Sequence, residues 1–362
     1  MKTYLAVLGR QPEISLAELA ALFHNVRKIA PELATFEAED TPNIDRLGGS
    51  LKVAERLDGG ILDYLLALPE GKITLGISDY SRKATVRSVR AEAMRIKKAL
   101  VKEGRSVRIV ENKSTVLSTA SAHHNRLGIK PRAVEIICFG GQRYLSLGAQ
   151  NITAYARRDQ ARPARDAKVG MLPPKLAQIL INLCGELPAG ATVLDPFCGT
   201  GVVLQEAYLM RYRPYGTDKD ERMVRYARRN MEWLAGGESN IKVADATTAK
   251  WEGPIDAVAC ETYLGSPMSR PPVEIKLKTE QEICRDIIIG FLKNLQGQIR
   301  SGTPVVLAVP AWLRPNGEYA KLDLDVLDEL EYNRGNEVGY GDLLYHRDGQ
   351  VVARNIITLR KK

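Results

Sequence analysis

The sequence contains few cysteines and no long apolar run. No window approaches ~18 consecutive apolar residues, so we expect no transmembrane helix and no membrane partner. The apolar stretch near the N-terminus stops at Gly9-Arg10, too early for a signal peptide. The five cysteines are scattered and form no CxxC pair. This pattern favours the reducing cytoplasm as the location and argues against a cysteine-based zinc site, and we predict no metal.

Positive charge is concentrated in one stretch of the chain. The full sequence of 362 residues has 52 Lys and Arg against 43 Asp and Glu, a net charge of +9. Residues 72–132 alone hold 15 basic and 4 acidic residues, a net +11, whereas residues 301–350 carry a net −5. This asymmetry favours a polyanion-binding module joined to a nearly neutral domain. The alternative is a solvated helix face, which is the commoner explanation of an isolated charge run.

The order of strand and helix patterns predicts four regions. Residues 1–60 alternate strand and helix signals, and residues 61–150 form a small α+β module with most of the positive charge. Residues 151–170 contain four arginines and no apolar periodicity, so we interpret them as a linker. From residue 171 to 362 strands alternate with helices, which indicates an α/β fold with a doubly wound parallel sheet.

A glycine-rich turn marks the start of the predicted parallel sheet. The apolar strand Thr192 to Asp195 leads into Pro196-Phe197-Cys198-Gly199-Thr200-Gly201, and a helix follows at once. Glycines in such a turn let the backbone approach a ligand and aim amide groups at it. The dinucleotide fingerprint GxGxxG and the P-loop GK[ST] are both absent.

Acidic residues end three successive strands of this region. Asp195 ends the first, Asp218 the second and Asp245 follows the third. We predict that Asp218 accepts hydrogen bonds from ribose hydroxyls and that Asp245 binds an adenine amino group. This arrangement fits S-adenosylmethionine better than NAD. The alternative is that the acids only cap the helices after each strand.

The fourth strand, Ile255 to Cys260, is followed by Glu261-Thr262-Tyr263-Leu264-Gly265. Together with VLDPFCGTG and the upstream RPARDAKVGMLPPKLAQI, the chain resembles the THUMP-domain RNA methyltransferases, in particular the archaeal and eukaryotic tRNA guanosine-N2 methyltransferases. LGGSLKVAE (47–55) and LSTASAHHNRLG (117–128) resemble the RNA-binding half of that family.

This resemblance implies a function, a fold and site residues. It implies a class I Rossmann-like methyltransferase domain over 171–362, a THUMP-like RNA-binding module over 61–150 and a ferredoxin-like module over 1–60. The partners would be structured RNA, above all tRNA, and a small activator subunit. S-adenosylmethionine would be held by Asp195, Phe197, Gly199, Gly201, Asp218 and Asp245.

The catalytic turn departs from the family pattern. The family has Asp-Pro-Pro-Tyr, in which the acid accepts hydrogen bonds from the target amine and the aromatic ring stacks on a flipped base. Here Glu261, Thr262, Tyr263 and Leu264 take those places. We therefore predict Glu261 as the catalytic carboxylate and Tyr263 as the stacking residue.

The RNA phosphates would be bound by Arg87, Arg90 and Arg95, which lie off the apolar stripe of a predicted helix. Two other functions remain open. A DNA amino-methyltransferase shares the fourth-strand turn, and a non-catalytic RNA-binding protein would explain why the turn is altered. Cys198 and Cys260 are interpreted as packing residues rather than nucleophiles.

Overall fold

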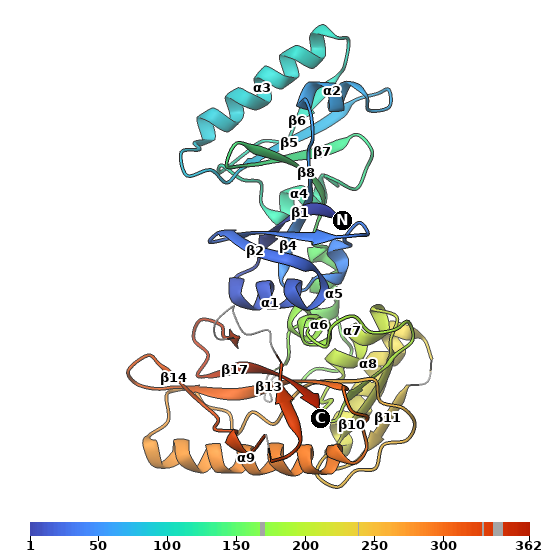
Figure 1. The fold of residues 1–362 in the computed structure, drawn as a ribbon, viewed down its shortest axis with the longest axis vertical. Coiled ribbons are helices and arrows are strands. Elements are labelled where there is room, and N and C mark those ends of the chain that lie inside the picture. Colours follow the sequence, from blue (N-terminus) through green and yellow to red (C-terminus); the bar gives the residue numbers. More distant parts are fainter. Residues whose placement is uncertain (167–170, 238, 328, 336–342) are drawn as a thin grey trace. The chain divides into compact units, whose positions relative to one another are not determined.

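The structure is a computed structural model that describes residues 1–166, 171–237, 239–327, 329–335 and 343–362 (Figure 1). The chain divides into two compact units. The first comprises residues 1–12 and 23–154, and the second comprises residues 13–22 and 155–362. Among the described residues, no helix combines the length and apolar composition that crossing a bilayer requires.

The first unit is built on one mixed sheet with the strand order β2-β3-β1-β4-β8-β7-β5-β6. Strands β7 and β8 form a hairpin, in which Phe139 pairs with Gln142. In chain order its elements are β1 (Lys2–Leu8), β2 (His24–Ala30), β3 (Leu33–Ala38), β4 (Ser50–Arg56), α2 (Ile61–Leu66), β5 (Ile73–Asp79), α3 (Val86–Lys102), β6 (Val107–Ile109), α4 (Thr119–His124), β7 (Ala133–Phe139) and β8 (Gln142–Ala149).

Helix α3 carries the apolar stripe that the sequence predicts. Its buried residues recur every three or four positions and pack on β5 and β6, beside which the helix lies in Figure 1: Val89, Ala93, Ile96 and Leu100. A capping box between Thr85 and Ser88 starts the helix, since each side chain binds the other's backbone N–H. The basic residues of α3 are thereby left on its outer face.

The second unit contains a sheet with the order β11-β10-β9-β12-β13-β17-β15. Neighbours from β11 to β13 are parallel, whereas β17 is antiparallel to β13. In chain order its elements are α1 (Pro12–Leu22), α5 (Ile152–Gln160), α6 (Pro174–Asn182), β9 (Thr192–Asp195), α7 (Val202–Leu209), β10 (Arg213–Asp218), α8 (Glu221–Ala235), β11 (Asn240–Val243), β12 (Ala257–Glu261), α9 (Glu274–Gln296), β13 (Pro304–Leu313), β14 (Tyr319–Lys321), β15 (Tyr332–Arg334), β16 (Leu344–Tyr345) and β17 (Val352–Lys361).

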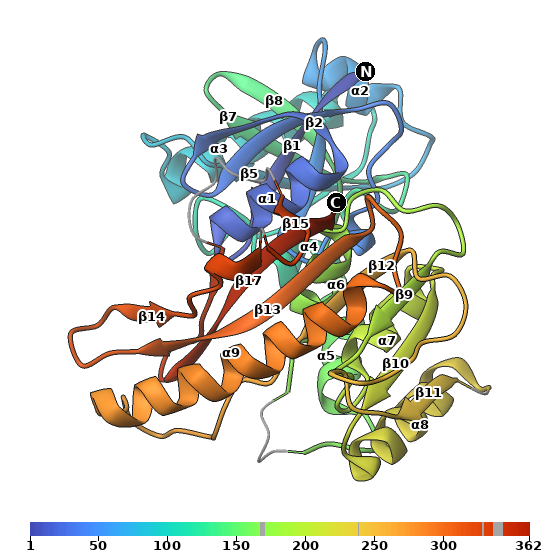
Figure 2. The same cartoon turned by 60° about the horizontal axis from the view of Figure 1, so that its bottom comes forward.

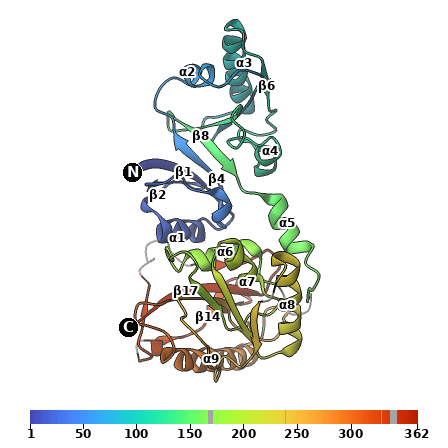
Figure 3. The same cartoon turned by 90° about the vertical axis from the view of Figure 1, so that its right-hand side faces the viewer.

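Both faces of this second sheet are covered by helices, as expected for a buried parallel sheet. Figure 2 shows α9 lying along β13 and β17, and Figure 3 shows α6 and α7 on the opposite side of the sheet from α9. The central strands β9 and β12 are almost wholly buried between these layers. The α/β doubly wound, Rossmann-like fold predicted for this part of the chain is confirmed.

The predicted region boundaries differ from the two units. Strands β4 and β8 lie on either side of residue 60 but pair with each other, so residues 1–60 and 61–150 share one sheet. Helix α1 comes early in the sequence, yet its residues Ile14 and Ala17 belong to the core of the second unit. Sequence patterns cannot show such contacts, because the partners lie 88 to 97 residues apart in the β4–β8 pair and more than 150 residues apart in the core around α1.

The predicted linker is also more ordered than its composition suggested. Residues 152–160 form α5, whose first turn is capped by the Asn151 side chain accepting from the Ala154 N–H at 3.0 Å. Tyr155 on this helix is buried, and the Arg158 guanidinium lies over its ring. Residues 167–170 of the predicted linker lie outside the described residues.

Candidate active site

A cavity of about 330 Å³ lies at the carboxyl ends of β9, β10 and β12. Strands β10 and β12 flank β9, and the chain turns to opposite sides of β9 at this point, which is where open α/β sheets bind ligands. Of the predicted site residues, the cavity is lined by Asp195, Phe197, Gly199, Asp218, Asp245, Glu261 and Tyr263. The fold therefore collects seven residues that are spread over 69 positions of sequence.

The glycine-rich turn is tied to the neighbouring strand by Asp218. Gly199, with φ at +48°, donates its N–H to Asp218 Oδ2 at 2.9 Å. Asp218 Oδ1 accepts from the Asp220 N–H at 2.9 Å. Burial raises the pKa of the Asp218 carboxyl, an effect opposed by these two backbone bonds. Each oxygen has accepted one bond and keeps a lone pair for a ligand hydroxyl.

Asp195 is the most deeply buried acid of the cavity. Its Oδ1 accepts from the Phe197 N–H at 3.1 Å, which fixes the turn after β9. Burial raises the pKa of the Asp195 carboxyl well above its usual value, and the nearby Asp218 and Glu261 add to that effect. A cationic ligand group in this cavity would be drawn to the same cluster of acids.

Asp245 lies directly beyond β11 and is mostly exposed to solvent. Thr247 donates to its Oδ1 from both its backbone N–H, at 2.8 Å, and its hydroxyl, at 2.7 Å. These hydrogen bonds lower the pKa of the Asp245 carboxyl. The side chain is therefore held as an oriented acceptor at the edge of the cavity.

Gly201, predicted to bind the cofactor, is not among the residues that line the cavity. It is the N-cap of α7 with φ at +83°, a conformation that favours glycine. A Cβ at this position would come within 3.1 Å of the Ala227 Cβ on α8. The glycine is therefore needed for the turn and for close packing of the two helices, and its contact with the cofactor stays a prediction.

Glu261, the last residue of β12, is in an ion pair that the sequence did not reveal. Its Oε1 accepts from Nε of Arg354, on β17, at 2.8 Å. The side chains are 16% and 6% exposed, so the pair is largely removed from water. Arg354 also donates to Gln350 Oε1 at 3.2 Å. One carboxylate oxygen of Glu261 is thus oriented by Arg354, while the residue lines the cavity.

The two residues after Glu261 have different environments. Thr262 is buried, and its N–H donates to the Ala308 carbonyl of β13 at 3.1 Å. Tyr263 is 38% exposed, and Lys219 Nζ lies 5.8 Å from the centroid of its ring. An aromatic ring is therefore available at the cavity, while the backbone before it is anchored to the sheet.

Two cysteines adjoin the cavity and are both buried. Burial raises the pKa of the Cys198 and Cys260 thiols well above their usual value. Cys198 packs in a core cluster with α7 and α8. Thiolates are the nucleophilic form of cysteine, so this burial supports a packing role for both.

The arginines predicted to bind substrate lie on α3 of the first unit. Arg90 contacts Glu111 Oε1 at 3.2 Å and the Asn112 carbonyl at 2.7 Å. Arg95 forms two 2.7 Å hydrogen bonds to Glu92. Arg87 is exposed. Two of the three cations predicted to bind phosphate are therefore already matched with carboxylates.

Sequence reasoning missed several residues that line the cavity: Asp166, Lys219, Met223 and Thr247. Lys219 and Thr247 follow the strand-end acids by one and two positions, so the same motif could have indicated them. Asp166 fell in the predicted linker. It pairs with Arg222 of α8 at 3.1 Å.

Comparison with known proteins identifies the class of this domain. The family model of the RMKL-like methyltransferase domain (UPF0020) matches residues 162–281. These residues include β9 to β12 and nearly all residues that line the cavity. The second unit thus contains a methyltransferase domain.

The chain is also similar to two archaeal proteins named tRNA (guanine(10)-N2)-dimethyltransferase. It is 32% identical to that of Methanothermobacter thermautotrophicus over 157 residues, which cover 43% of this chain and 44% of the relative. It is 27% identical to that of Pyrococcus abyssi over 316 residues, 83% and 88% of the two chains. The match thus spans less than half of the first relative and most of the second.

Among solved structures, TrmN from Thermus thermophilus is similar over 99% of this chain and 100% of its own. Its identity is 20% and the TM-score is 0.48.

Proposed function

We propose that the protein transfers a methyl group from S-adenosylmethionine to the N2 amine of guanosine in tRNA. The observation that carries this proposal is the gathering of Asp195, Asp218, Asp245 and Glu261 around one cavity of a methyltransferase domain. The names of the two archaeal relatives support guanine N2 and tRNA as the acceptor. The net +11 of residues 72–132 supports an RNA partner.

The cavity has the donor and acceptor groups that S-adenosylmethionine would need. Asp218 keeps lone pairs on both oxygens for the two ribose hydroxyls, and Asp245 is an oriented acceptor for the adenine amino group. Phe197 and Ala246 supply apolar surface for the adenine ring. When bound, the sulfonium supplies an activated methyl group, so that no metal is needed to polarise the donor.

Glu261 is the acceptor for the guanine amine. Its Oε1 is held by Arg354, which leaves Oε2 for an N–H of the amine. Accepting that N–H would keep electron density on the nitrogen that attacks the methyl carbon. As the nitrogen–carbon bond forms, the carbon–sulfur bond would break and the thioether would leave, and the amine proton would pass to Glu261 or to water. The Thr262 carbonyl is the second acceptor, and its backbone is fixed by the Thr262 N–H bond to β13.

The turn after β12 replaces the two stiff prolines of the related turn by hydrogen bonds. Besides the Thr262 anchor, Ser266 donates its N–H to Glu280 Oε2 at 2.9 Å, and Gly265 has φ at +84°. Tyr263 is the ring on which the flipped guanine stacks. These contacts support a turn that is fixed in place without proline, which catalysis requires because a ~1 Å displacement can cost about 100-fold in rate.

The test is methyl transfer from labelled S-adenosylmethionine to tRNA, read by nucleoside analysis. A transcript with guanine at position 10 is compared with one that has adenine there, because the relatives are named for that base. Labelled N2-methylguanosine or N2,N2-dimethylguanosine from the first transcript alone is the expected result. Label in any other nucleoside contradicts the proposal.

A variant of the turn after β12 distinguishes the catalytic hypothesis from the binding-protein hypothesis. Glu261→Asp with Thr262→Pro, Tyr263→Pro and Leu264→Tyr rebuilds the turn of the resembling family. If the wild type binds cofactor and RNA but transfers no methyl group, and the rebuilt turn does, the natural protein is an RNA-binding protein. Transfer to duplex DNA and not to RNA would instead favour the DNA amino-methyltransferase.

A further inference from the structure

The first unit contains a second cavity, of about 450 Å³, with a strongly basic lining. It lies where β5 and β7 begin and where the chain passes from α4 to β7. Five cationic side chains line it: Lys72, Arg108, Arg126, Lys130 and Arg132. These residues come from three separate stretches of sequence, and no carboxylate is among the described residues of the lining.

Carboxylates of the described residues do not neutralise the charges of this basic cavity. In the part of the chain that the structure describes, none of its five cations forms an ion pair, although Arg90 and Arg95 of α3 both do. Five like charges around one hollow repel each other and raise the local positive potential. The free energy of that repulsion is recovered when an anion enters, so the cavity favours a ligand with several negative charges.

Two of the arginine side chains are held in place by neutral groups. Arg108 donates to Asn125 Oδ1 at 2.6 Å, and Arg132 donates to the Glu70 carbonyl at 2.6 Å. Each guanidinium has five N–H donors, so most of them remain for a ligand. Fixing the guanidinium in advance lowers the entropy cost of binding, a feature typical of built anion sites.

The backbone that carries Arg126 is strained. Arg126 has φ at +54°, which is uncommon for a residue with a side chain. Its N–H donates to the His123 carbonyl at 2.9 Å, and its carbonyl accepts from Ile129 and Lys130 at 3.2 Å each. At Gly128 a Cβ would come within 2.3 Å of the Ser146 carbonyl oxygen. The loop therefore packs closely against β8, which leaves no room for a side chain at Gly128. Backbone strain of this kind is common at binding sites.

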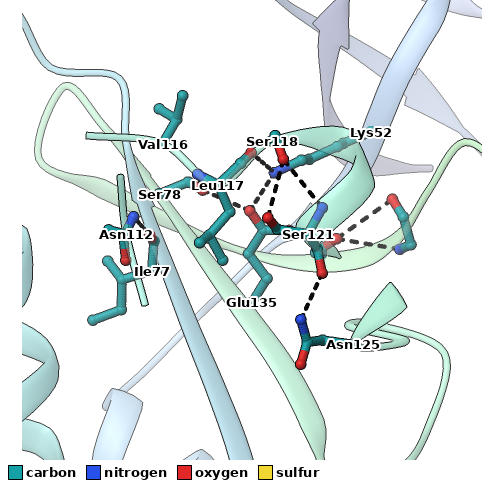
Figure 4. Close-up of polar contacts among 12 residues, drawn as sticks. Lys52, Ile77, Ser78, Asn112, Val116, Leu117, Ser118, Ser121, Asn125 and Glu135 are labelled. Carbon is teal, nitrogen blue, oxygen red and sulfur yellow. Dashed lines mark hydrogen bonds and ion pairs between the residues drawn. The ribbon is translucent and has the colours of Figure 1, made fainter. Parts of the chain in front are cut away.

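A buried polar cluster anchors the segment that leads into this loop (Figure 4). Lys52 donates to Glu135 Oε1 at 2.5 Å and to the Leu117 carbonyl at 2.8 Å. Ser78 donates its hydroxyl to Glu135 at 2.6 Å and accepts from the Leu117 N–H at 2.9 Å. Lys52 and Glu135 have side chains only 2% and 0% exposed, so forming this cluster costs the desolvation free energy of two charges. It fixes the chain immediately before α4.

Helix α4 connects the buried polar cluster to the basic cavity. Ser118 caps the helix by accepting from the Ser121 N–H at 3.1 Å, and Asn125 donates to the Ser121 carbonyl at 2.9 Å (Figure 4). Asn125 is also the residue that holds Arg108. Arg108 is therefore linked by hydrogen bonds to α4, and the segment before α4 is bonded to the cluster of side chains from β4, β5 and β7.

We propose that this basic cavity is a phosphate-binding site for the RNA backbone, in addition to the site of methyl transfer. The inference rests on the proposed function for the choice of RNA among polyanions. A hollow lined by five cations fits a turned or single-stranded backbone, which brings several phosphates together, better than the straight face of a duplex. The Thr74 hydroxyl, also in the lining, can contact a ribose 2′-hydroxyl.

The variant that tests this inference is Lys72→Gln with Arg126→Asn and Lys130→Gln. All three side chains are exposed, and asparagine tolerates the positive φ of position 126. Arg108 and Arg132 are kept because they bond to the fold. The matched control is Lys83→Gln with Lys98→Gln and Lys102→Gln, which removes three exposed charges of the same unit and leaves the same net charge.

The measurement is binding of a fluorescently labelled tRNA transcript across a series of salt concentrations. Three lost phosphate contacts should lower the slope of log affinity against log salt by about 2 to 3, and affinity at ~0.1 M salt on the order of 100-fold. The control should stay within a few-fold of wild type. Calorimetric binding of S-adenosylmethionine should be unchanged in both variants, which shows that the second unit is intact.

Three results would overturn the inference. They are wild-type tRNA affinity in the cavity variant, an equal loss in the control, or tighter wild-type binding to duplex DNA of the same length than to tRNA. The readout is binding rather than methyl transfer. If the wild type methylates tRNA and the cavity variant binds tRNA as tightly as the wild type, only the phosphate-site inference is refuted. If the cavity variant loses tRNA affinity but the wild type transfers no methyl group, only the enzymatic proposal is refuted.

Discussion

Replacing Arg354 by glutamine removes the charge partner of Glu261. The two groups meet at 2.8 Å, with side chains 6% and 16% exposed. In Arg354→Gln the carboxylate keeps its negative charge in a place that water reaches poorly, and the guanidinium bond to Gln350 is lost as well. The perturbation therefore acts on stability and on the proposed reaction together.

The expected loss of unfolding free energy is about 2 to 4 kcal/mol. Breaking a fully buried ion pair by removing one partner costs ~3–5 kcal/mol, because an unpaired charge stays in the interior. Glu261 lines a cavity, and its side chain is 16% exposed, so water recovers part of that cost. We therefore expect a loss of about 2 to 4 kcal/mol, somewhat less than for a fully buried pair.

The assay is a double-mutant cycle followed by chemical denaturation. In Glu261→Gln with Arg354→Gln two amides replace the ion pair, and we expect the double variant to be more stable than Arg354→Gln. The coupling energy should be ~1–3 kcal/mol. Additive single changes would show that the ion pair contributes nothing to stability and would refute this prediction.

Methyl transfer by the same variants separates the two roles of Glu261. In Glu261→Gln, Arg354 takes the amide oxygen, and the amide N–H₂ then faces the cavity, where it cannot accept from the guanine amine. We expect transfer to fall sharply while binding of cofactor and RNA stays nearly intact. Wild-type transfer rates in Glu261→Gln would show that the carboxylate takes no part in the reaction.

Four further predictions concern Asp218, the turn at Gly201 and the buried Cys260 thiol. Asp218→Ala should weaken cofactor binding in calorimetry by ~1.5–3 kcal/mol, and unchanged affinity refutes the ribose assignment. Because burial raises the pKa of the Asp218 carboxyl from 3.8, wild-type cofactor affinity should fall as pH is lowered through that raised pKa, and Asp218→Asn should flatten this dependence. Gly201→Ala should lower the unfolding free energy by ~1–3 kcal/mol, because φ is +83° and the added Cβ lies 3.1 Å from Ala227; wild-type stability would contradict this packing argument. Burial raises the pKa of the Cys260 thiol, so we expect a thiol reagent at neutral pH to modify it far more slowly in the folded than in the denatured protein, and equal rates would contradict the buried environment.

The sequence alone was sufficient to predict the parallel sheet and seven of the residues that line its cavity, whereas their contact with a ligand stays a prediction. Strand periodicity and glycine position are local properties, and the carboxyl ends of parallel strands meet at one edge of the sheet. Once Asp195, Asp218 and Glu261 were assigned to the ends of neighbouring strands, their convergence followed. The cavity is lined by all three.

Charge counting was less informative, since it does not say which charges are already paired. The net +11 of residues 72–132 correctly indicated a basic region, and the arginines of α3 were the apparent ligands. Their contact with RNA stays a prediction. In the structure Arg90 and Arg95 lie against carboxylates at 3.2 and 2.7 Å. Ion pairing depends on side-chain positions that composition does not contain.

Contacts between distant parts of the sequence were decided only by the tertiary structure. Arg354 follows Glu261 by 93 positions and meets it because β13 pairs with both β12 and β17. Lys72 and Lys130 come to one cavity because β5 and β7 start side by side in the sheet. Periodicity fixes which residues share a face within an element, whereas the pairing of strands sets which elements, and therefore which charges, become neighbours.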